Sequence, residues 1–383
     1  MKFRVERDVL ADAVAWAARS LPVRPSVPVL AGLLIEASDE GLVLSTFDYE
    51  TSARATLTDA QVSDEGQALV SGRLLADICR SLPAKPVEMV LEGPRVSLTC
   101  GAARFSLQTM PVEDYPSLPS MPAATGTVPS EQFAHAVAQA VTAAGRDDML
   151  PVLTGVRIEI DGSSISLLAT DRFRLSHREL DWSPHTPDES VAALVPARVL
   201  GDTAKALTAG GEVTIALSAT GSGEGIIGFE GGGPGGARRT TTRLLDGEFP
   251  KVRSLFPGEH LTTAKIDKAD LIDSVKRVAL VAERNTAVQL AFTNEGGGQL
   301  TLDAGSGEEA QASESLHAEI DGDDLVTGFN PQFLLDGLTA IDEPVVELAF
   351  TQASKPVVMS GAAQESGHVP SFRYLLMPRR LLS

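Results

Sequence analysis

The segment 170–175 (TDRFRL) places one carboxylate, two guanidinium groups and an aromatic ring within six consecutive residues. An enzyme acting through this segment would need a nucleophile or a pair of carboxylates beside it, and the sequence offers neither. Asp171 is therefore interpreted as a residue that caps or salt-bridges a turn, and Asp48 stands in a matching context. Phe173 and Leu175 are bulky and apolar, and they are predicted to line a groove for a partner peptide.

No other pattern of residues indicates catalysis, a metal centre or a cofactor. The six histidines are scattered singly, without His-x-His or His-Glu-x-x-His spacing. The chain has no Gly-x-Ser-x-Gly elbow and no dinucleotide fingerprint after a strand. The glycine-rich segment 231–236 lacks the Gly-Lys-Ser/Thr ending of a phosphate-binding loop, so it is predicted to be a hairpin tip. Cys79 and Cys100 have neither metal-ligand nor disulfide spacing and are predicted to be buried.

The elements that must position these residues are repeated along the chain. Residues 30–57 match residues 153–180 at a constant separation of 123 residues, and a third, looser copy follows. Each copy opens with a helical pattern, continues with alternating strands and contains a second helix. Ser130 is expected to be the N-cap of the opening helix in the second copy, and Asp267 or Asp270 in the third.

Two helices and about eight strands per copy predict an α+β fold with the helices on one face of antiparallel sheets. Proline-rich and glycine-containing joints at 115–122 and 256–259 separate the copies. The sequence therefore predicts three tandem domains, with boundaries at 1–122, 128–256 and 260–383. Tandem copies of a domain are typical of rings, arcs and scaffolds.

Composition is that of a globular protein, with 43% hydrophobic and 22% charged residues over 383 positions. No apolar run approaches the roughly 18 residues of a membrane span, and the charged start is unlike a signal peptide, so an intracellular, cytoplasmic location is expected. The net charge of −19 argues, taken alone, against nucleic acid.

At short range, however, the local electrostatic field governs contact with a partner, and the net charge does not. Basic residues recur on the predicted helices. Arg73 and Arg198 occupy the same position of the repeat. If the helices face inward, the inner wall could be less acidic or even basic, while the strands carry the negative charge outward.

Several runs in the right order make the whole chain resemble the bacterial DNA polymerase III beta subunit family, the beta sliding clamps. The most specific runs are RPSVPVL (24–30), DICRSLP (77–83), ATDRFRL (169–175), LDGEFP (245–250), GFN (328–330) and YLLMP (374–378). The resemblance implies a non-catalytic replication processivity factor, a homodimeric DNA clamp fold whose six domains close a ring around duplex DNA and slide along it. Contacts between such a ring and the DNA are directed at phosphates and are independent of base sequence.

The resemblance also assigns residues to surfaces. The residues that match the DNA-facing positions are Arg24, Arg73, Arg80, Arg146, Arg198 and Lys205. Ring closure would place Phe105 and Leu107 of one subunit against Leu280 and Val281 of the other, as an apolar core at a sheet edge. Such a heterologous contact must rotate to closure, or the chain would polymerise.

A groove between the second and third copies would bind short peptides of the DNA polymerase III alpha subunit, the clamp loader, other polymerases and repair proteins. The residues that match it are Leu153, Thr170, Arg172, Phe173, Arg174, Leu175, Pro250, Leu255, Pro356, Leu375, Met377 and Arg379. Two features depart from the family pattern: Arg379 is followed by Arg380, and His177 follows the pocket strand.

Two further hypotheses differ from a replicative clamp. A duplicate clamp with an altered groove would resist a groove-binding inhibitor and still serve replication. An enzyme acting through segment 170–174 would need the nucleophile that the sequence lacks. We expect no catalytic residue, metal or cofactor.

Overall fold

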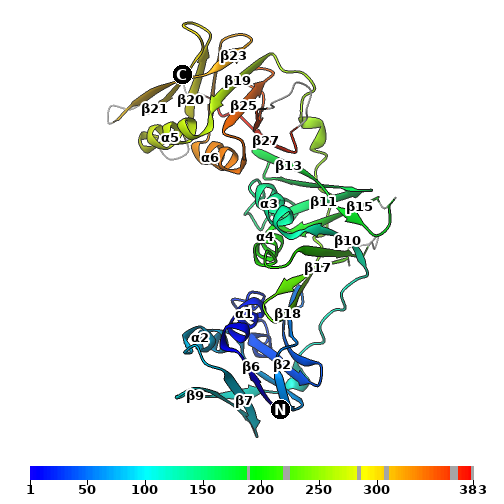
Figure 1. Cartoon of the computed structure of the whole chain (residues 1–383). Coiled ribbons are helices and arrows are strands. Elements are labelled where there is room, and N and C mark those ends of the chain that lie inside the picture. Colours follow the sequence, from blue (N-terminus) through cyan, green and yellow to red (C-terminus); the bar gives the residue numbers. More distant parts are fainter. Residues whose placement is uncertain (188–189, 219–224, 283–285, 306–309, 363–369, 381–383) are drawn as a thin grey trace.

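The described residues form a crescent of three consecutive units, with six helices on the concave side and the sheets extending toward the convex side (Figure 1). This computed structural model describes residues 1–187, 190–218, 225–282, 286–305, 310–362 and 370–380. The amino-terminal and carboxy-terminal units stand at the two ends of the crescent, and the second unit joins them.

The first unit contains two helices, nine strands and two short 3-10 helices. These are β1 Lys2–Val5, α1 Arg7–Ala18, η1 Pro28–Ala31, β2 Gly32–Ser38, β3 Gly41–Phe47, β4 Thr51–Leu57, β5 Gln61–Asp64, β6 Gly66–Ser71, α2 Gly72–Ser81, β7 Val87–Glu92, β8 Arg95–Cys100, β9 Ala103–Met110 and η2 Val112–Asp114.

The second unit repeats this order of elements. It comprises β10 Ala124–Pro129, α3 Ser130–Val141, η3 Pro151–Thr154, β11 Gly155–Asp161, β12 Ser164–Thr170, β13 Arg174–Asp181, β14 Ser183–Pro184, β15 Ser190–Pro196, α4 Ala197–Ala206, β16 Glu212–Leu217, β17 Ile226–Gly233 and β18 Gly236–Arg243, and η4 Arg253–Leu255 follows it. The glycine-rich segment 231–236 is the tip of the β17–β18 hairpin, as predicted.

The third unit also has two helices. It comprises β19 Thr262–Asp267, α5 Lys268–Val278, η5 Ala279–Val281, β20 Val288–Thr293, β21 Gln299–Ala304, β22 Ala312–His317, β23 Glu319–Asp321, β24 Leu325–Phe329, α6 Pro331–Ala340, β25 Val345–Phe350, β26 Val357–Gly361 and β27 Phe372–Leu376.

Apolar residues spaced three and four apart bury one stripe of each helix against the sheets. In α2 this stripe is Leu75, Ile78 and Cys79, and Cys79 and Cys100 are both buried, as predicted. Because burial stabilises the neutral thiol, the pKa of Cys79 is raised to about 12, with Cys100 adding to the effect. Both cysteines therefore serve as core residues.

Side-chain caps start both α5 and α6, and at α6 the Asn330 Oδ1 accepts hydrogen bonds from the backbone N–H groups of Gln332 and Phe333. The Asp267 carboxylate accepts a hydrogen bond from the backbone N–H of Asp270 (3.0 Å), which makes Asp267 the N-cap of α5. The expectation that Ser130 caps α3 was wrong: Pro129 is the cap position, and the Ser130 hydroxyl donates to the Gly210 carbonyl instead. A serine inside the first turn is free to bond to a neighbouring loop.

Two of the sheets continue from one unit into the next. A 14-stranded sheet joins the first and second units through the antiparallel pair β4–β18, with Ala53 opposite Thr240. A nine-stranded sheet joins the second and third units through β13–β27, with Leu175 opposite Leu375. A four-stranded sheet, β22-β21-β20-β24, forms the outer part of the third unit. Backbone hydrogen bonds thus connect all three units.

Candidate functional site

The same turn follows the repeated hairpin in the first and second units. Asp171 Oδ1 accepts hydrogen bonds from the backbone N–H groups of Phe173 (3.0 Å) and Arg174 (3.1 Å). Asp48 Oδ1 does the same for the two equivalent N–H groups 123 residues earlier, at 3.0 and 2.7 Å. The predicted structural role of both aspartates is confirmed, since each closes a turn through its own backbone.

The residue after each of these aspartates has left-handed backbone geometry. Tyr49 has φ 74° and Arg172 has φ 79°, a conformation that costs energy for residues with a Cβ. They are the only non-glycine residues with positive φ in the part of the chain that the structure describes. The repeat has therefore preserved a strained turn, which presents the side chains on either side of it.

Arg174 fastens the second unit to the third. Its Nε donates to Asp171 Oδ2 (2.9 Å), and its Nη1 donates to Asp336 Oδ2 (2.5 Å) on α6 and lies 3.4 Å from the Tyr374 hydroxyl. The guanidinium also lies over the ring of Phe333, 4.3 Å from its centroid. Burial alone would lower the pKa of Arg174, but Tyr374 and the hydrogen bonds to both carboxylates raise it. A side chain that is 5% exposed and bonded to both carboxylates holds the joint together and offers little to a peptide.

Five groove candidates from the segments around this joint are exposed, and we call this set the strip. Phe173 is 52% exposed, Leu255 is 51% exposed and Met377 is 40% exposed. The backbone N–H of Met377 donates to the Phe173 carbonyl (2.9 Å), so residues from two units meet in the strip. Pro250 and Arg172 are also exposed. Exposed apolar side chains at a joint between units are suited to bind an apolar peptide.

The remaining groove candidates lie beneath or beside the exposed strip. Thr170 is buried, and its hydroxyl donates to the Arg174 carbonyl (2.7 Å). Three leucines are also buried, and two of them face each other across the β13–β27 pair: Leu153, Leu175 and Leu375. Pro356 and Arg379 are half-buried. These residues supply support for the strip more than contact surface.

His177 lies inside the joint and away from solvent. Its side chain is 2% exposed, packs against Phe256, and accepts a hydrogen bond at Nδ1 from Arg373 (2.9 Å). Burial, followed by the charges of Arg373 and Arg253, lowers its pKa to about 4. His177 is therefore a neutral packing residue at neutral pH, and it does not line the exposed strip.

All six basic candidates are exposed and lie on the helices or on the loops after them. Arg73 and Arg198 are each the second residue of their helix, α2 and α4, so the predicted equivalence is confirmed. These helices border the concave side of the crescent (Figure 1). Within the described residues, four of the six side chains form no ion pair or hydrogen bond: Arg24, Arg146, Arg198 and Lys205. Arg73 donates to the Pro22 carbonyl (2.8 Å), and Arg80 pairs with Asp77 (3.1 Å).

Sheet edges lie at both ends of the crescent. In the described part of the chain, β22 pairs only with β21, and β9 pairs with β6 only at its last two residues. Phe105 on β9 is 36% exposed and Leu280 is 84% exposed, whereas Val281 is half-buried. Leu107 is 3% exposed and belongs to the core of its own unit. Phe105 and Leu107 are two residues apart and therefore lie on the same face of β9, where Leu107 is packed in the core and Phe105 is partly exposed.

Sequence reasoning missed Asp336, Phe333 and Tyr374, which hold Arg174. The available signal was the second helix of each unit, because Asp202 and Asp336 occupy the same position in α4 and α6. No group of three His, Cys, Asp or Glu side chains among the described residues could hold a metal ion. Their helices also include none long and apolar enough to cross a membrane.

Comparison with known proteins agrees with this architecture. Models of the DNA polymerase III beta subunit match the amino-terminal domain over residues 1–119, the central domain over 127–251 and the carboxy-terminal domain over 253–380. The beta sliding clamp of Streptomyces coelicolor is 58% identical over 382 residues, covering 100% of both chains. The sliding clamp of Pseudomonas aeruginosa bound to griselimycin has a TM-score of 0.88 and 26% identity, again with full coverage of both chains.

Three clamp domains arranged as a crescent define a subunit of a ring-forming DNA clamp. The chain belongs to the DNA polymerase III beta subunit family, the beta sliding clamps. Its function is that of a non-catalytic processivity factor of DNA replication, and the predicted α+β clamp fold is confirmed. A relative named beta sliding clamp homolog GriR, from Streptomyces muensis, is more distant at 42% identity over 381 residues, covering 99% of both chains. The comparison therefore favours an ordinary clamp over a duplicate.

Proposed function

We propose that two copies of this chain close head to tail around duplex DNA, slide along it, and tether partner proteins through the strip at the joint of the second and third units. The observation that carries this proposal is that Arg24, Arg146, Arg198 and Lys205, which are exposed and have no ion pair or hydrogen bond among the described residues, lie on or after helices that border the concave side (Figure 1). A concave surface of this kind can attract duplex DNA even though the whole chain is acidic. Electrostatic interactions between exposed charges act only over about a Debye length of 8–10 Å.

The DNA-facing residues should contact phosphates without reading bases. A triple variant with Arg24, Arg73 and Arg198 changed to Ala should load onto nicked circular DNA less well and show a shallower salt dependence of binding. Each lost phosphate contact reduces the slope of log K against log salt by about 0.9. Lys265→Ala, on a strand of the third unit, is the matched control. An unchanged slope in the triple variant would contradict this assignment.

Ring closure should use the β9 and β22 edges, with Phe105 on β9 and Leu280 in η5. Placing a carboxylate at Phe105 or Leu280 would bury an unpaired charge in the contact. Phe105→Glu and Leu280→Glu should therefore convert the dimer into monomers in sedimentation velocity and abolish processive synthesis. Val326→Glu is the control, since Val326 is 48% exposed on the opposite edge of the same four-stranded sheet. A dimer that persists in both edge variants would rule out this interface.

The exposed strip should bind short peptides with apolar anchors, from the DNA polymerase III alpha subunit, the clamp loader, other polymerases and repair proteins. Phe173→Ala should weaken the binding of a polymerase tail peptide about tenfold or more, as expected for a central aromatic anchor. Leu261→Ala, which removes a side chain that is 70% exposed at the start of the third unit, should leave the affinity unchanged. Equal affinity of both variants for the peptide would place the groove elsewhere.

Griselimycin, which is bound to the Pseudomonas aeruginosa clamp in its crystal structure, should compete for the same strip. The side chain of His177 is 2% exposed, so we do not expect it to contact a ligand on the strip, and its burial supports an ordinary groove. An affinity for griselimycin that matches an ordinary clamp would remove the resistant-duplicate alternative. A cytoplasmic location follows from this role in replication.

The boundaries 1–122, 128–256 and 260–383 are supported by the linkers between them. Residues 115–123 contain neither helix nor strand, and β19 begins at Thr262. β10 begins at Ala124 and pairs with β16, so strand residues of the second unit extend a few positions before 128. Limited proteolysis should cut first within 115–123, because extended, partly exposed linkers are cleaved before paired strands.

A further inference from the structure

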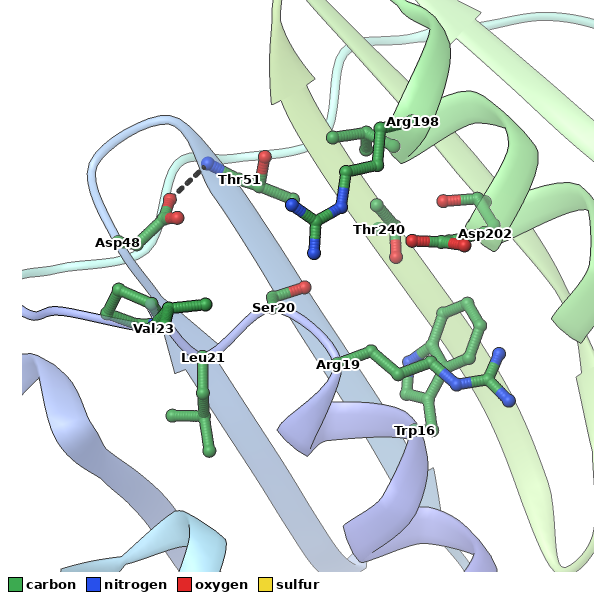
Figure 2. A pocket seen from close by; sticks show the side chains of 13 residues that line it. Trp16, Arg19, Ser20, Leu21, Val23, Asp48, Thr51, Arg198, Asp202 and Thr240 are labelled. Atoms are coloured by element: carbon green, nitrogen blue, oxygen red, sulfur yellow. Dashed lines mark hydrogen bonds between the residues drawn. The ribbon is translucent and has the colours of Figure 1, made fainter. Parts of the chain in front are cut away.

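A cleft of about 280 Å³ lies at the joint between the first and second units. The carboxy-terminal end of α1 and the loop after it form one wall, and the amino-terminal turns of α4 form the other (Figure 2). Asp48, Thr51, Asp202 and Thr240 line it together with Val199. This cleft is separate from the strip at the second joint.

The cleft is the repeat counterpart of the place that Arg174 fills. The 123-residue separation relates Asp48 to Asp171 and Thr51 to Arg174. The strand register agrees, because Thr240 pairs with Ala53 and the register equivalent of Thr240 is Tyr374, which pairs with Ser176.

The two helices agree as well. Buried residues at 200, 203 and 204 in α4 correspond to buried residues at 334, 337 and 338 in α6. This correspondence relates Asp202 to Asp336 and Val199 to Phe333. Both carboxylates that hold the Arg174 guanidinium thus have equivalents in the cleft, in Asp48 and Asp202.

The guanidinium itself has no equivalent on the turn. Thr51 replaces Arg174, and its short side chain lies 3.2 Å from the Thr242 hydroxyl. Within the described residues, the Asp202 carboxylate forms no ion pair or hydrogen bond, and Asp48 uses only Oδ1, for its own turn. Its other oxygen is the one that, in Asp171, accepts from the arginine.

We propose that this cleft binds the guanidinium of an arginine side chain from a partner protein, in the way that the second joint binds Arg174. A charge-assisted pair of hydrogen bonds to two carboxylates selects guanidinium over other groups by its planar geometry. Leu21 and Val23 border the cleft, and Val23 is 70% exposed, so the arginine should stand next to an apolar residue. The acidic chain, with a net charge of −19, attracts such a basic segment.

Arg198 modulates this site. It stands where α6 has Gln332, whose amide donates to Asp336 Oδ1 (2.8 Å), and its side chain projects into the cleft between Thr51 and Asp202 (Figure 2). Arg19 extends past Trp16, away from Thr51. A resident cation opposes a second one, so Arg198→Gln should strengthen guanidinium binding. If the cleft bound an anion instead, Arg198→Gln would weaken binding, because Arg198 would then be the main ligand.

The test uses the full-length protein and N-acetyl-L-arginine amide, with the neutral, nearly isosteric N-acetyl-L-citrulline amide as the control ligand, in titration calorimetry or ligand-observed NMR. We expect the arginine probe to bind and the citrulline probe not to bind. Arg198→Gln should tighten binding several-fold, and Asp202→Asn should weaken it about tenfold or more. Asp77→Asn, which removes the same charge from the exposed face of α2, should change nothing.

Thr51→Arg supplies the missing guanidinium within the chain and should abolish probe binding without lowering the unfolding midpoint. If Thr51→Arg does not fold, Asp202→Asn carries the same test. Loss of binding in Arg198→Gln, equal binding of the citrulline probe, or no binding of the arginine probe by the wild type and Arg198→Gln would each overturn the proposal. The proposal that peptides bind at Phe173 does not depend on these outcomes, because the strip is separate from this cleft.

Discussion

Replacing Arg174 by Met tests how the second and third units are held together. The substitution keeps an unbranched side chain but removes the hydrogen bonds to Asp171 and Asp336 and the cation above Phe333. Removing one partner of a buried ion pair costs about 3–5 kcal/mol, because the remaining charge is left without compensation. The two carboxylates are 16% and 27% exposed and retain some hydration, so we expect a value near the lower end, about 3 kcal/mol.

Hydrogen exchange measures this cost at the joint itself. A loss of about 3 kcal/mol from local opening accelerates exchange roughly a hundredfold. The most informative amides are those that bond across β13 and β27 and the Met377 N–H, which donates to Phe173. The amides of the β4–β18 pair, at the other joint, serve as an internal reference and should keep their rates.

A matched variant separates this effect from the loss of any cation. Lys276→Met removes one end of an exposed pair with Asp273, at 61% and 64% exposure, and should cost less than about 0.5 kcal/mol. The double variant Arg174→Met with Asp336→Leu should regain part of the loss, because one of the two carboxylates left without a cation is then also removed. Exchange rates at β13–β27 that change by less than threefold in Arg174→Met would refute the reasoning.

Three further predictions concern titration, chemistry and packing. The pKa of His177 is lowered to about 4 in the folded chain, against about 6.5 when unfolded, so the unfolded state binds the proton first as the pH falls. Stability should decrease between pH 6.5 and 4 by up to roughly 3 kcal/mol, and urea titrations of His177→Phe should lack that part of the pH dependence. Cys79 and Cys100 should resist a thiol reagent in the native protein and react fully in urea, since both are buried and the pKa of Cys79 is about 12; fast native labelling would contradict this. Leu75→Ala should destabilise the first unit by about 2–5 kcal/mol in the same titrations, because Leu75 is completely buried, and a loss below about 1 kcal/mol would contradict its place in the core.

Periodicity and repetition were enough to predict the fold and the turns. The separation of 123 residues relates Asp48 to Asp171, and both residues close the same hydrogen-bonded turn. Local signals of this kind depend only on a residue and its neighbours along the chain, so they can be recognised in the sequence.

Partners distant in sequence could not be predicted in this way. Nothing in the sequence around Arg174 distinguishes it from an exposed arginine. Only the tertiary structure shows that Asp336, 162 residues later, holds it at the joint. The resemblance places Leu107 at the intersubunit contact together with Phe105, and only the tertiary structure shows that Leu107 is 3% exposed and packs in the core of its own unit. Ser130 had the right type for a cap, but the helix begins one residue early.

The backbone ladders at β4–β18 and β13–β27 have a mechanical consequence. Since paired strands run through both internal joints, bending the crescent there would shear rows of amide hydrogen bonds, whereas the linkers 115–123 and 257–261 carry no such load. Mechanical strain on a closed ring would therefore separate the two subunits at the contact between them. Each subunit would keep its curvature.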